Sequence, residues 1–180
     1  MIVRKAVRSD LPAVDAIYGE IHTQEEAGAV TTGWKRGVYP VMDTARNALE
    51  RGDLFVLDAD GAVLGAGIIN QIQMDVYAGA PWAYSVPDRL VCVLHTLVIS
   101  PSAGQKGLGT FFIRFYEEYA RSHGFPELRI DTNARNLRAR SLYRRLGYRE
   151  IDIVPTVFNG LPDVDLVLLE KTLDLPAEEK

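Results

Sequence analysis

The sequence has little of what disulfide or metal chemistry requires, with one cysteine and three histidines in 180 residues. One cysteine cannot form an internal disulfide, and the scattered histidines show no metal-ligand spacing, so we expect no metal site. Cys92 stands in the apolar run 90–94, which favours a small buried side chain over a nucleophile. A lone thiol suits a reducing compartment, and we therefore expect a cytoplasmic protein.

Long apolar runs and an excess of positive charge are also missing. No run approaches the ~20 residues that cross a bilayer, and residues 1–5 lack the apolar stretch of a signal peptide. The net charge of −4 argues against nucleic acid as a partner. Residues 104–149, however, carry ten Lys and Arg but four Asp and Glu. This segment predicts either a solvated basic helix face or a local site for a phosphorylated ligand.

The composition and the length of the chain indicate one globular domain. Hydrophobic residues make up 47% and charged residues 24% of the chain, and 180 residues suit a single domain. We expect this domain to span residues 1–175 and a frayed tail to follow over residues 176–180.

Hydrophobic spacing predicts strands and helices in the order β-α-α-β-β-β-α-β-α-β-β, which indicates one mixed sheet with helices on its faces. Strand 89–99 is almost continuously apolar, so it should be central and covered on both faces. Residues 22–40 lack a clean period and are expected mainly as a loop, with room for a helical turn near Glu25 and Glu26. The expected strands are 2–6, 54–58, 62–71, 89–99, 128–132, 148–154 and 164–169, and the expected helices are 10–21, 44–50, 108–123 and 139–146.

A glycine-rich turn lies between strand 89–99 and the helix that follows. Glycines allow tight backbone turns, and the free N–H groups of a helix N-terminus attract anions, so the turn could hold a pyrophosphate. The spacing fits neither the Walker pattern nor the dinucleotide fingerprint, and such a turn is often only a turn. Its residues are Gly104, Gln105, Lys106, Gly107, Leu108, Gly109 and Thr110.

A second motif follows the turn at residues 136–148, which read NLRARSLYRRLGY. It closely resembles the N-x-x-A-x-x-L-Y-x-x-x-G-F/Y signature of the GNAT superfamily of acyl-CoA N-acyltransferases. The resemblance extends over residues 91–151. One departure is that Gly104 stands where the family's phosphate turn usually has Arg or Gln, and Gln105 follows one position later.

The resemblance implies an α/β (α+β), single-domain GNAT-like fold, with a central mixed, mostly antiparallel sheet of about seven strands and helices on both faces. Strands 89–99 and 128–132 would splay apart and admit acetyl-CoA, and a strand N–H near Leu97 would bind the thioester oxygen. Arg138 or Arg145 would meet the 3′-phosphate. The other implied coenzyme contacts are Val98, Ile99, the turn residues 104–110, Asn136, Ala139 and Tyr143.

The implied reaction moves an acetyl group from acetyl-CoA directly to an amine, on a small molecule or a peptide. Tyr143 matches the family's general acid, and a phenol with pKa near 10 can protonate a leaving thiolate. Without the motif, Tyr143 would be read as a core aromatic. His95 precedes Leu97 by two residues, so we expect both side chains on one strand face and His95 as a candidate base. Other candidate bases are Glu25, Glu26 and Asp131.

Two connections, 22–40 and 71–87, are expected to form the acceptor pocket. Their aromatic and acidic residues suit a cationic amine or an amino-acid head group. The expected pocket residues are Trp34, Tyr39, Asn70, Gln71, Tyr77, Trp82 and Asp131. Three alternatives stay open: an inactive CoA-binding sensor, a longer acyl donor, and a homodimer. No membrane partner is expected.

Overall fold

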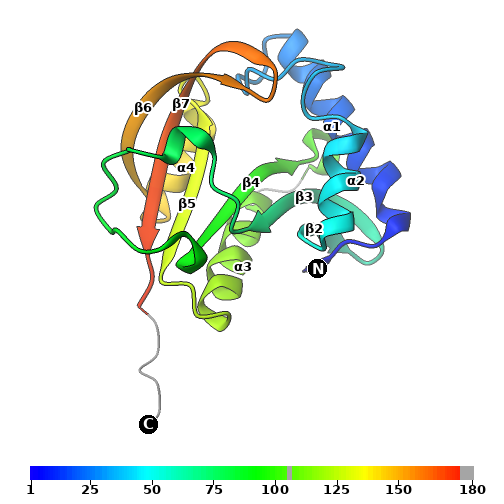
Figure 1. Ribbon diagram of the computed structural model, residues 1–180. Coiled ribbons are helices and arrows are strands. Elements are labelled where there is room, and N and C mark those ends of the chain that lie inside the picture. Colours follow the sequence, from blue (N-terminus) through cyan, green and yellow to red (C-terminus); the bar gives the residue numbers. More distant parts are fainter. Residues whose placement is uncertain (105–106, 175–180) are drawn as a thin grey trace.

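The computed structural model describes residues 1–104 and 107–174, which form one sheet flanked by helices (Figure 1). The predicted order of strands and helices is confirmed. The strands are β1 (Ile2–Lys5), β2 (Leu54–Ala59), β3 (Ala62–Asn70), β4 (Val91–Ile99), β5 (Glu127–Asn133), β6 (Arg149–Phe158) and β7 (Leu161–Thr172). The helices are α1 (Leu11–Glu26), α2 (Met42–Arg51), α3 (Leu108–Ser122) and α4 (Leu137–Arg145).

The seven strands form a single sheet in the order β1-β2-β3-β4-β5-β7-β6. Among the strands of the described residues, only β4 and β5 run parallel, because α3 crosses over between them, and the other neighbouring pairs are antiparallel. The mixed, mostly antiparallel sheet therefore agrees with the prediction.

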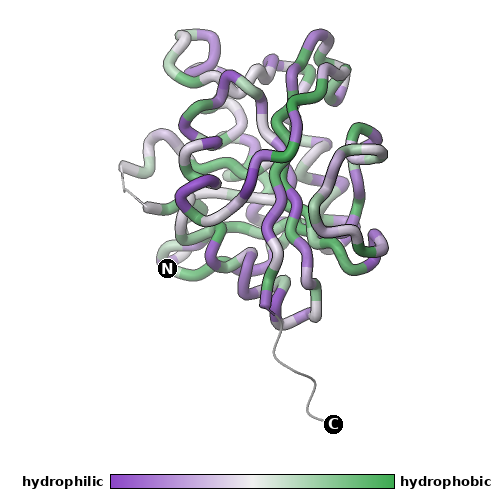
Figure 2. The backbone as a smooth tube through the Cα atoms, turned by 90° about the vertical axis from the view of Figure 1, so that its left-hand side faces the viewer, coloured by the Kyte–Doolittle hydropathy of each residue, from purple (hydrophilic) through white to green (hydrophobic). Residues whose placement is uncertain are grey.

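Two pairs of helices cover opposite faces of this sheet. Helices α1 and α2 pack against β2 and β3 through one apolar cluster that includes Ile17 and Val56. Helices α3 and α4 pack on the other face, where Phe112 and Leu142 meet the strands. Figure 2 shows hydrophobic and hydrophilic stretches alternating along the chain, as expected for helices with one face toward a core. No helix in residues 1–104 or 107–174 is long and apolar enough to cross a membrane.

The connection that joins β3 to β4, residues 71–90, covers the part of the sheet that α1 and α2 leave open (Figure 1). Its side chains pack with β4 and β7 in a third apolar cluster that includes Tyr77, Val93 and Leu168. Strand β4 is therefore covered on both faces, as predicted.

Strands β4 and β5 separate partway along their length. Their pairing runs from Val91–Glu127 to Leu94–Ile130 and ends there, although β4 continues to Ile99. A β-bulge at this point explains the separation, because a bulge bends and twists its strand. The register against β3 jumps from the pair His95–Ile68 to the pair Val98–Ala66, which gives β4 one extra residue.

Several boundaries differ from the sequence prediction. Helix α1 continues through residues 22–26, so the helical turn expected near Glu25 and Glu26 is the end of α1 and not a separate turn in a loop. His22 is buried and bonded to the Pro40 carbonyl (2.9 Å). Strand β4 begins at Val91, because residues 88–90 form a 3-10 turn. Asp10 is the N-cap residue of α1 but makes no side-chain capping hydrogen bond to the helix. Its carboxylate instead accepts hydrogen bonds from the Val7 N–H and from Arg4. The expected tail, 176–180, lies outside the described residues.

Candidate active site

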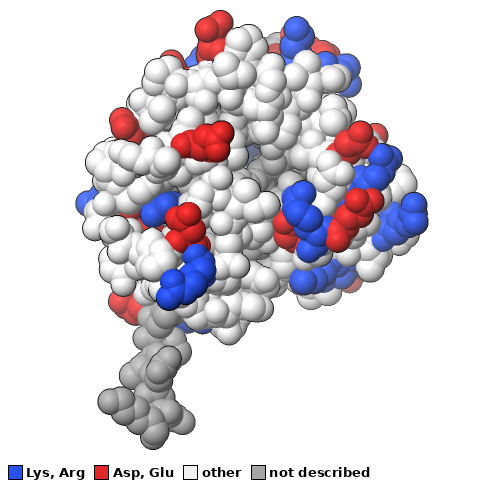
Figure 3. Space-filling model, viewed as in Figure 1, with Lys and Arg blue, Asp and Glu red and all other residues white. Residues whose placement is uncertain are grey.

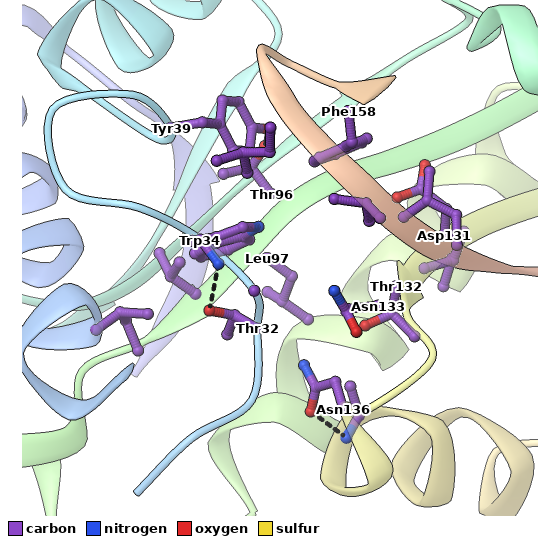
Figure 4. A pocket seen from close by; sticks show the side chains of 18 of the residues that line it. Thr32, Trp34, Tyr39, Thr96, Leu97, Asp131, Thr132, Asn133, Asn136 and Phe158 are labelled. Carbon is purple, nitrogen blue, oxygen red and sulfur yellow. Dashed lines mark hydrogen bonds between the residues drawn. The ribbon is translucent and has the colours of Figure 1, made fainter. Parts of the chain in front are cut away.

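A cleft opens where β4 and β5 part, and it is the place that the resemblance implies for acetyl-CoA. Residues of both strands, of α4, of the loop after α1 and of the β6–β7 hairpin line it (Figure 4). On the β4 side the lining includes Leu97, Val98 and Ile99. Since their pairing with β5 has ended, the backbone groups of this stretch that point across the gap are available to a ligand.

The bulge residue Thr96 connects the strand to the loop after α1. Thr96 has a positive φ of 50°, a conformation that a β-branched residue rarely adopts. Its hydroxyl bonds the hydroxyl of Tyr39 across the cleft. Burial raises the pKa of Tyr39, so that phenol stays protonated. This hydrogen bond holds the loop after α1 against β4 at the position where β4 and β5 separate.

Helix α4 brings Tyr143 and its neighbours to the cleft. Asn136 caps the helix, because its side chain accepts from the Ala139 N–H at 3.1 Å, and both residues line the cleft. Tyr143 is buried and also lines the cleft. Its burial raises the pKa of the phenol, and the charge of nearby Asp131 raises it further. Tyr143 is therefore a neutral O–H donor at neutral pH.

Asp131 is the one charged side chain among the described residues that line the cleft. Its Oδ2 accepts a hydrogen bond from the Tyr77 hydroxyl at 2.7 Å. Burial raises the pKa of this carboxyl, while nearby His95 and the Tyr77 hydrogen bond lower it. Because β5 places Asp131 beside Thr132 and Asn133, the cleft combines one anion with several neutral polar groups (Figure 4).

Three aromatic rings form the wall of the cleft away from α4. Trp34 and Tyr39 meet edge to face with ring centres 5.8 Å apart, and Tyr39 meets Phe158 in the same way at 5.3 Å. Phe158 was not predicted. It ends β6 at a tight turn whose residues Asn159 and Gly160 both have positive φ, so the Asn-Gly pair was the sequence signal for it.

The loop that carries Trp34 is fixed by Glu25. Its carboxylate accepts from the Thr32 N–H (2.6 Å), the Thr32 hydroxyl (2.9 Å) and the Gly33 N–H (3.1 Å). Glu26 instead pairs with Arg36 on the surface at 2.8 Å. Both carboxylates are thus engaged elsewhere, which leaves Asp131 as the cleft carboxylate among the candidate bases.

The expected placement of His95 beside Leu97 was wrong. The extra residue of the bulge breaks the two-residue alternation, so Leu97 packs with the α3 face while His95 lies with the opposite one. The His95 Nε2 lies 3.1 Å from both the Asn70 Oδ1 and the Ile72 carbonyl, so this nitrogen carries the proton and donates. Burial lowers the pKa of His95. His95 does not line the cleft.

The seven expected acceptor residues divide into two groups. Trp34, Tyr39 and Asp131 line the cleft, and Tyr77 lies directly behind Asp131. The structure does not bring the other three to it. Asn70 bonds Asp53, Gln71 bonds the Arg89 carbonyl, and Trp82 packs over Arg129.

The glycine-rich turn is described only in part, since Gln105 and Lys106 lie outside the described residues. Gly104 has a φ of 64°. This left-handed conformation favours glycine and accounts for its presence where the resemblance expects Arg or Gln. Gly107, with a φ of 88°, is the N-cap of α3. Leu108 is buried in the core, and a Cβ on Gly109 would lie 3.2 Å from Leu142 of α4.

Several arginines of the basic segment 104–149 form ion pairs with glutamates. Arg140, for example, pairs with Glu150 at 2.7 Å, and Arg114, Arg121 and Arg149 each pair with a glutamate. Arg138 is exposed, and Arg145 donates to Ser141 on the same helix. On the face drawn in Figure 3, charged side chains gather at the flanks around a largely uncharged centre.

In residues 1–104 and 107–174, no group of three or more His, Cys, Asp or Glu side chains is placed to hold a metal ion. Cys92 is buried, as predicted.

Solved structures of known proteins share this fold. A protein from Streptococcus agalactiae, described as an acetyltransferase of the GNAT family, superposes with a TM-score of 0.80 over 96% of this chain and 95% of its own, at 20% identity. The structure of YncA from Salmonella typhimurium with its cofactor acetyl-CoA gives a TM-score of 0.68, at 19% identity over 100% of this chain and 98% of its own. These similarities show the fold.

Sequence comparison identifies the family. The chain is 34% identical over 70 residues to the protein named "Uncharacterized N-acetyltransferase YhfO" of Bacillus subtilis, which covers 39% of this chain and 47% of that protein. The chain spans less than half the length of the curated relatives it matches. The model of the Acetyltransferase (GNAT) family matches residues 17–148, more than half of the chain. The protein therefore belongs to the GNAT acetyltransferase family.

Proposed function

We propose that this protein is an N-acetyltransferase that moves the acetyl group of acetyl-CoA to an amine. The observation that carries the proposal is the cleft between β4 and β5, in which a buried, neutral Tyr143 and the carboxylate of Asp131 both line the gap. An O–H donor and a proton acceptor are the two groups that direct transfer from a thioester to an amine requires.

The residues present fit acetyl-CoA. The unpaired edge of β4 at Leu97, Val98 and Ile99 offers strand N–H and C=O groups to the amides of the pantetheine arm. Asn136 and Ala139 line the same gap from α4. The first N–H groups of α3, after Gly107, have no acceptor within the helix and would hold the pyrophosphate. Exposed Arg138 or Arg145 would meet the 3′-phosphate, and Gln105 and Lys106 belong to the same proposed turn.

In the proposed reaction, Tyr143 donates one proton and Asp131 accepts one. The amine nitrogen forms a bond to the acetyl carbonyl carbon as the carbon–sulfur bond breaks. Tyr143 gives its hydroxyl proton to the departing thiolate. Because the pKa of the corresponding thiol, near 8.5, is below that of the phenol, this proton transfer is coupled to cleavage of the carbon–sulfur bond. Asp131 accepts the proton that the amine loses. The Leu97 N–H would stabilise the charge that develops on the carbonyl oxygen.

The cleft favours a cationic amine on an apolar or aromatic body. Asp131 attracts an ammonium group, and the rings of Trp34, Tyr39 and Phe158 offer aromatic faces and edges nearby. An acceptor with a carboxylate next to its amine would be repelled by Asp131, because both groups carry negative charge. We therefore expect tyramine and benzylamine to be better acceptors than free tyrosine.

The test is thiol release from acetyl-CoA over a panel of amines that includes tyramine, benzylamine, spermidine, tyrosine and a short alanine-led peptide. Acetyl-CoA binding is measured in parallel by thermal shift. Release with one amine class supports the proposal. A thermal shift without release from any amine between pH 6 and pH 9 would point to a CoA-binding sensor, and no shift would contradict the proposed coenzyme site.

The role of Tyr143 has its own variant. We expect Tyr143→Phe to lower kcat at least about tenfold while acetyl-CoA still binds, because general acid catalysis contributes about 10²–10⁴-fold. Tyr148→Phe is the matched control, since that phenol is also buried but does not line the cleft. Equal turnover in both variants would remove Tyr143 from the mechanism.

A further inference from the structure

We infer that Tyr77 is a positioning residue that holds one carboxylate oxygen of Asp131 and directs the other into the cleft. Tyr77 lies in the connection 71–90, away from the two motifs of the family, and it does not line the cleft itself. The inference rests on the proposed function of Asp131 for its catalytic meaning. The contact itself can be tested without any acceptor.

The first step concerns the face of β5 that this connection covers. Glu127, Arg129 and Asp131 alternate along β5, so their side chains project on the same face. A row of charged residues on an interior strand face requires partners, because a buried charge without a partner is costly. Residues of the connection supply these partners to Arg129 and Asp131.

The second step is the geometry of Tyr77. Its side chain is buried, with 3% of its surface exposed, and its hydroxyl donates to the Asp131 Oδ2 at 2.7 Å. No hydrogen bond from the described part of the chain engages Oδ1. The residue Asp131 as a whole is only partly buried and lines the cleft. Tyr77 therefore fixes the carboxylate from behind and leaves Oδ1 as the atom for an incoming amine.

The third step is how Tyr77 is itself held. The Trp82 indole N–H donates to the Tyr77 carbonyl at 2.9 Å, and the two rings meet at a centre distance of 5.3 Å. Trp82 also packs over the Arg129 guanidinium at 4.0 Å, and Arg129 donates to Gln73 at 3.0 Å. The Ala83 N–H lies 3.1 Å and 3.2 Å from the two carboxylate oxygens of Glu170 on β7. The connection is thus tied to β5 and β7 on both sides of Tyr77.

Four titratable groups face Asp131 from the elements packed around it. Tyr77 comes from the connection, His95 from β4, Tyr143 from α4 and Tyr39 from the loop after α1. Of these, only Tyr77 donates a hydrogen bond to the carboxylate. A hydrogen bond to the ionised form lowers the pKa of a carboxyl, so loss of the Tyr77 hydroxyl should make Asp131 harder to ionise.

The test is a titration of the side-chain carboxyl carbons by NMR in protein labelled at aspartate. The resonance missing from Asp131→Asn identifies Asp131. In Tyr77→Phe we expect its midpoint to move to higher pH by about one pH unit, the size expected for one hydrogen bond to a charged group. Tyr84→Phe is the matched control, because Tyr84 lies in the same connection and is 40% exposed. An unchanged midpoint in Tyr77→Phe would overturn the inference.

A second measurement applies if Tyr77→Phe fails to fold. In the unmodified protein, the buried hydroxyl proton of Tyr77 should change its chemical shift with the same midpoint as the Asp131 carboxyl. Different midpoints would show that the two groups are not hydrogen-bonded in solution.

Kinetics then connects the contact to the reaction. With the best amine of the panel, the acid limb of kcat/KM should move to higher pH in Tyr77→Phe and not in Tyr84→Phe. In an Asp131→Asn background, Tyr77→Phe should have no further effect on the pH profile. A carboxyl midpoint that moves while the kinetic limb does not would confirm the contact and remove Asp131 from catalysis.

Discussion

Gly33 gives a sharp test of how the cleft wall is built. It has a φ of 74°, and a Cβ added there would lie 2.4 Å from the Asn133 Nδ2 and 3.3 Å from its Cγ. Asn133 is buried, and its Oδ1 already accepts from the Arg135 N–H at 2.9 Å, so the amide cannot turn aside without losing that bond. Gly33→Ala therefore combines backbone strain with a steric clash across the cleft.

The magnitude follows from these two contributions. A left-handed backbone conformation costs an alanine about 1 kcal/mol, and overpacking at a buried contact adds about 1–2 kcal/mol. We expect a loss of about 2–3 kcal/mol in the free energy of unfolding. For a chain of this size that corresponds to a decrease of about 6–9 °C in Tm.

The chain offers a matched control at Gly28, in the same loop. Gly28 has a φ of 71°, but a Cβ there would meet no atom of the described residues within 4 Å. Gly28→Ala should lower Tm by only about 3 °C, because it carries the backbone strain alone. Thermal unfolding followed by circular dichroism measures both variants. Equal decreases in Tm would refute the contact between Gly33 and Asn133.

Two further predictions concern buried titratable groups away from the cleft. Burial and the charge of Glu170 raise the pKa of Glu127 to about 8, so the folded state binds a proton that the unfolded state releases, and stability should fall as pH rises from about 4.5 to about 8. Urea unfolding at pH 5 and pH 8.5 measures this loss of stability, which should be smaller in Glu127→Gln by up to a few kcal/mol. The same loss in both proteins would contradict the prediction. Burial also raises the pKa of the Cys92 thiol to about 12, so it should react with a disulfide reagent at pH 8 only on unfolding. Fast reaction of the native protein would show that the core around Cys92 opens.

The sequence was sufficient to predict the fold because its signals are local or belong to the two motifs. The helical spacing of apolar residues in α3 and the near-continuous apolar character of β4 each predict an element from neighbouring residues alone. The boundary of α1 was missed, since residues 22–26 are held in the helix by distant partners. His22 bonds the Pro40 carbonyl, and Glu25 bonds the loop at Thr32.

Several expected site residues of β4, of α4 and of the loop after α1 line the cleft, whereas those of the glycine-rich turn that the structure describes and those of the connection 71–90 do not. Asn70, Gln71 and Trp82 were expected in the acceptor pocket because a polar, aromatic connection resembles a pocket wall. In the structure this connection follows β5 and β7 instead, where Trp82 covers Arg129. No local pattern in the sequence specifies which strand a connection will cover.

The bulge at Thr96 shows why one residue can change the assignment of a site. By adding a residue to β4, it turns His95 to the face opposite Leu97 and bends the strand away from β5, which opens the cleft. It also presents the Thr96 hydroxyl to Tyr39, so the acceptor wall is joined to the same point. Because His95 lies on the other face of β4, Asp131 on β5, across the gap, remains as the candidate general base. The bulge that opens the proposed coenzyme cleft thus also determines which side chain we propose as the acceptor of the amine proton.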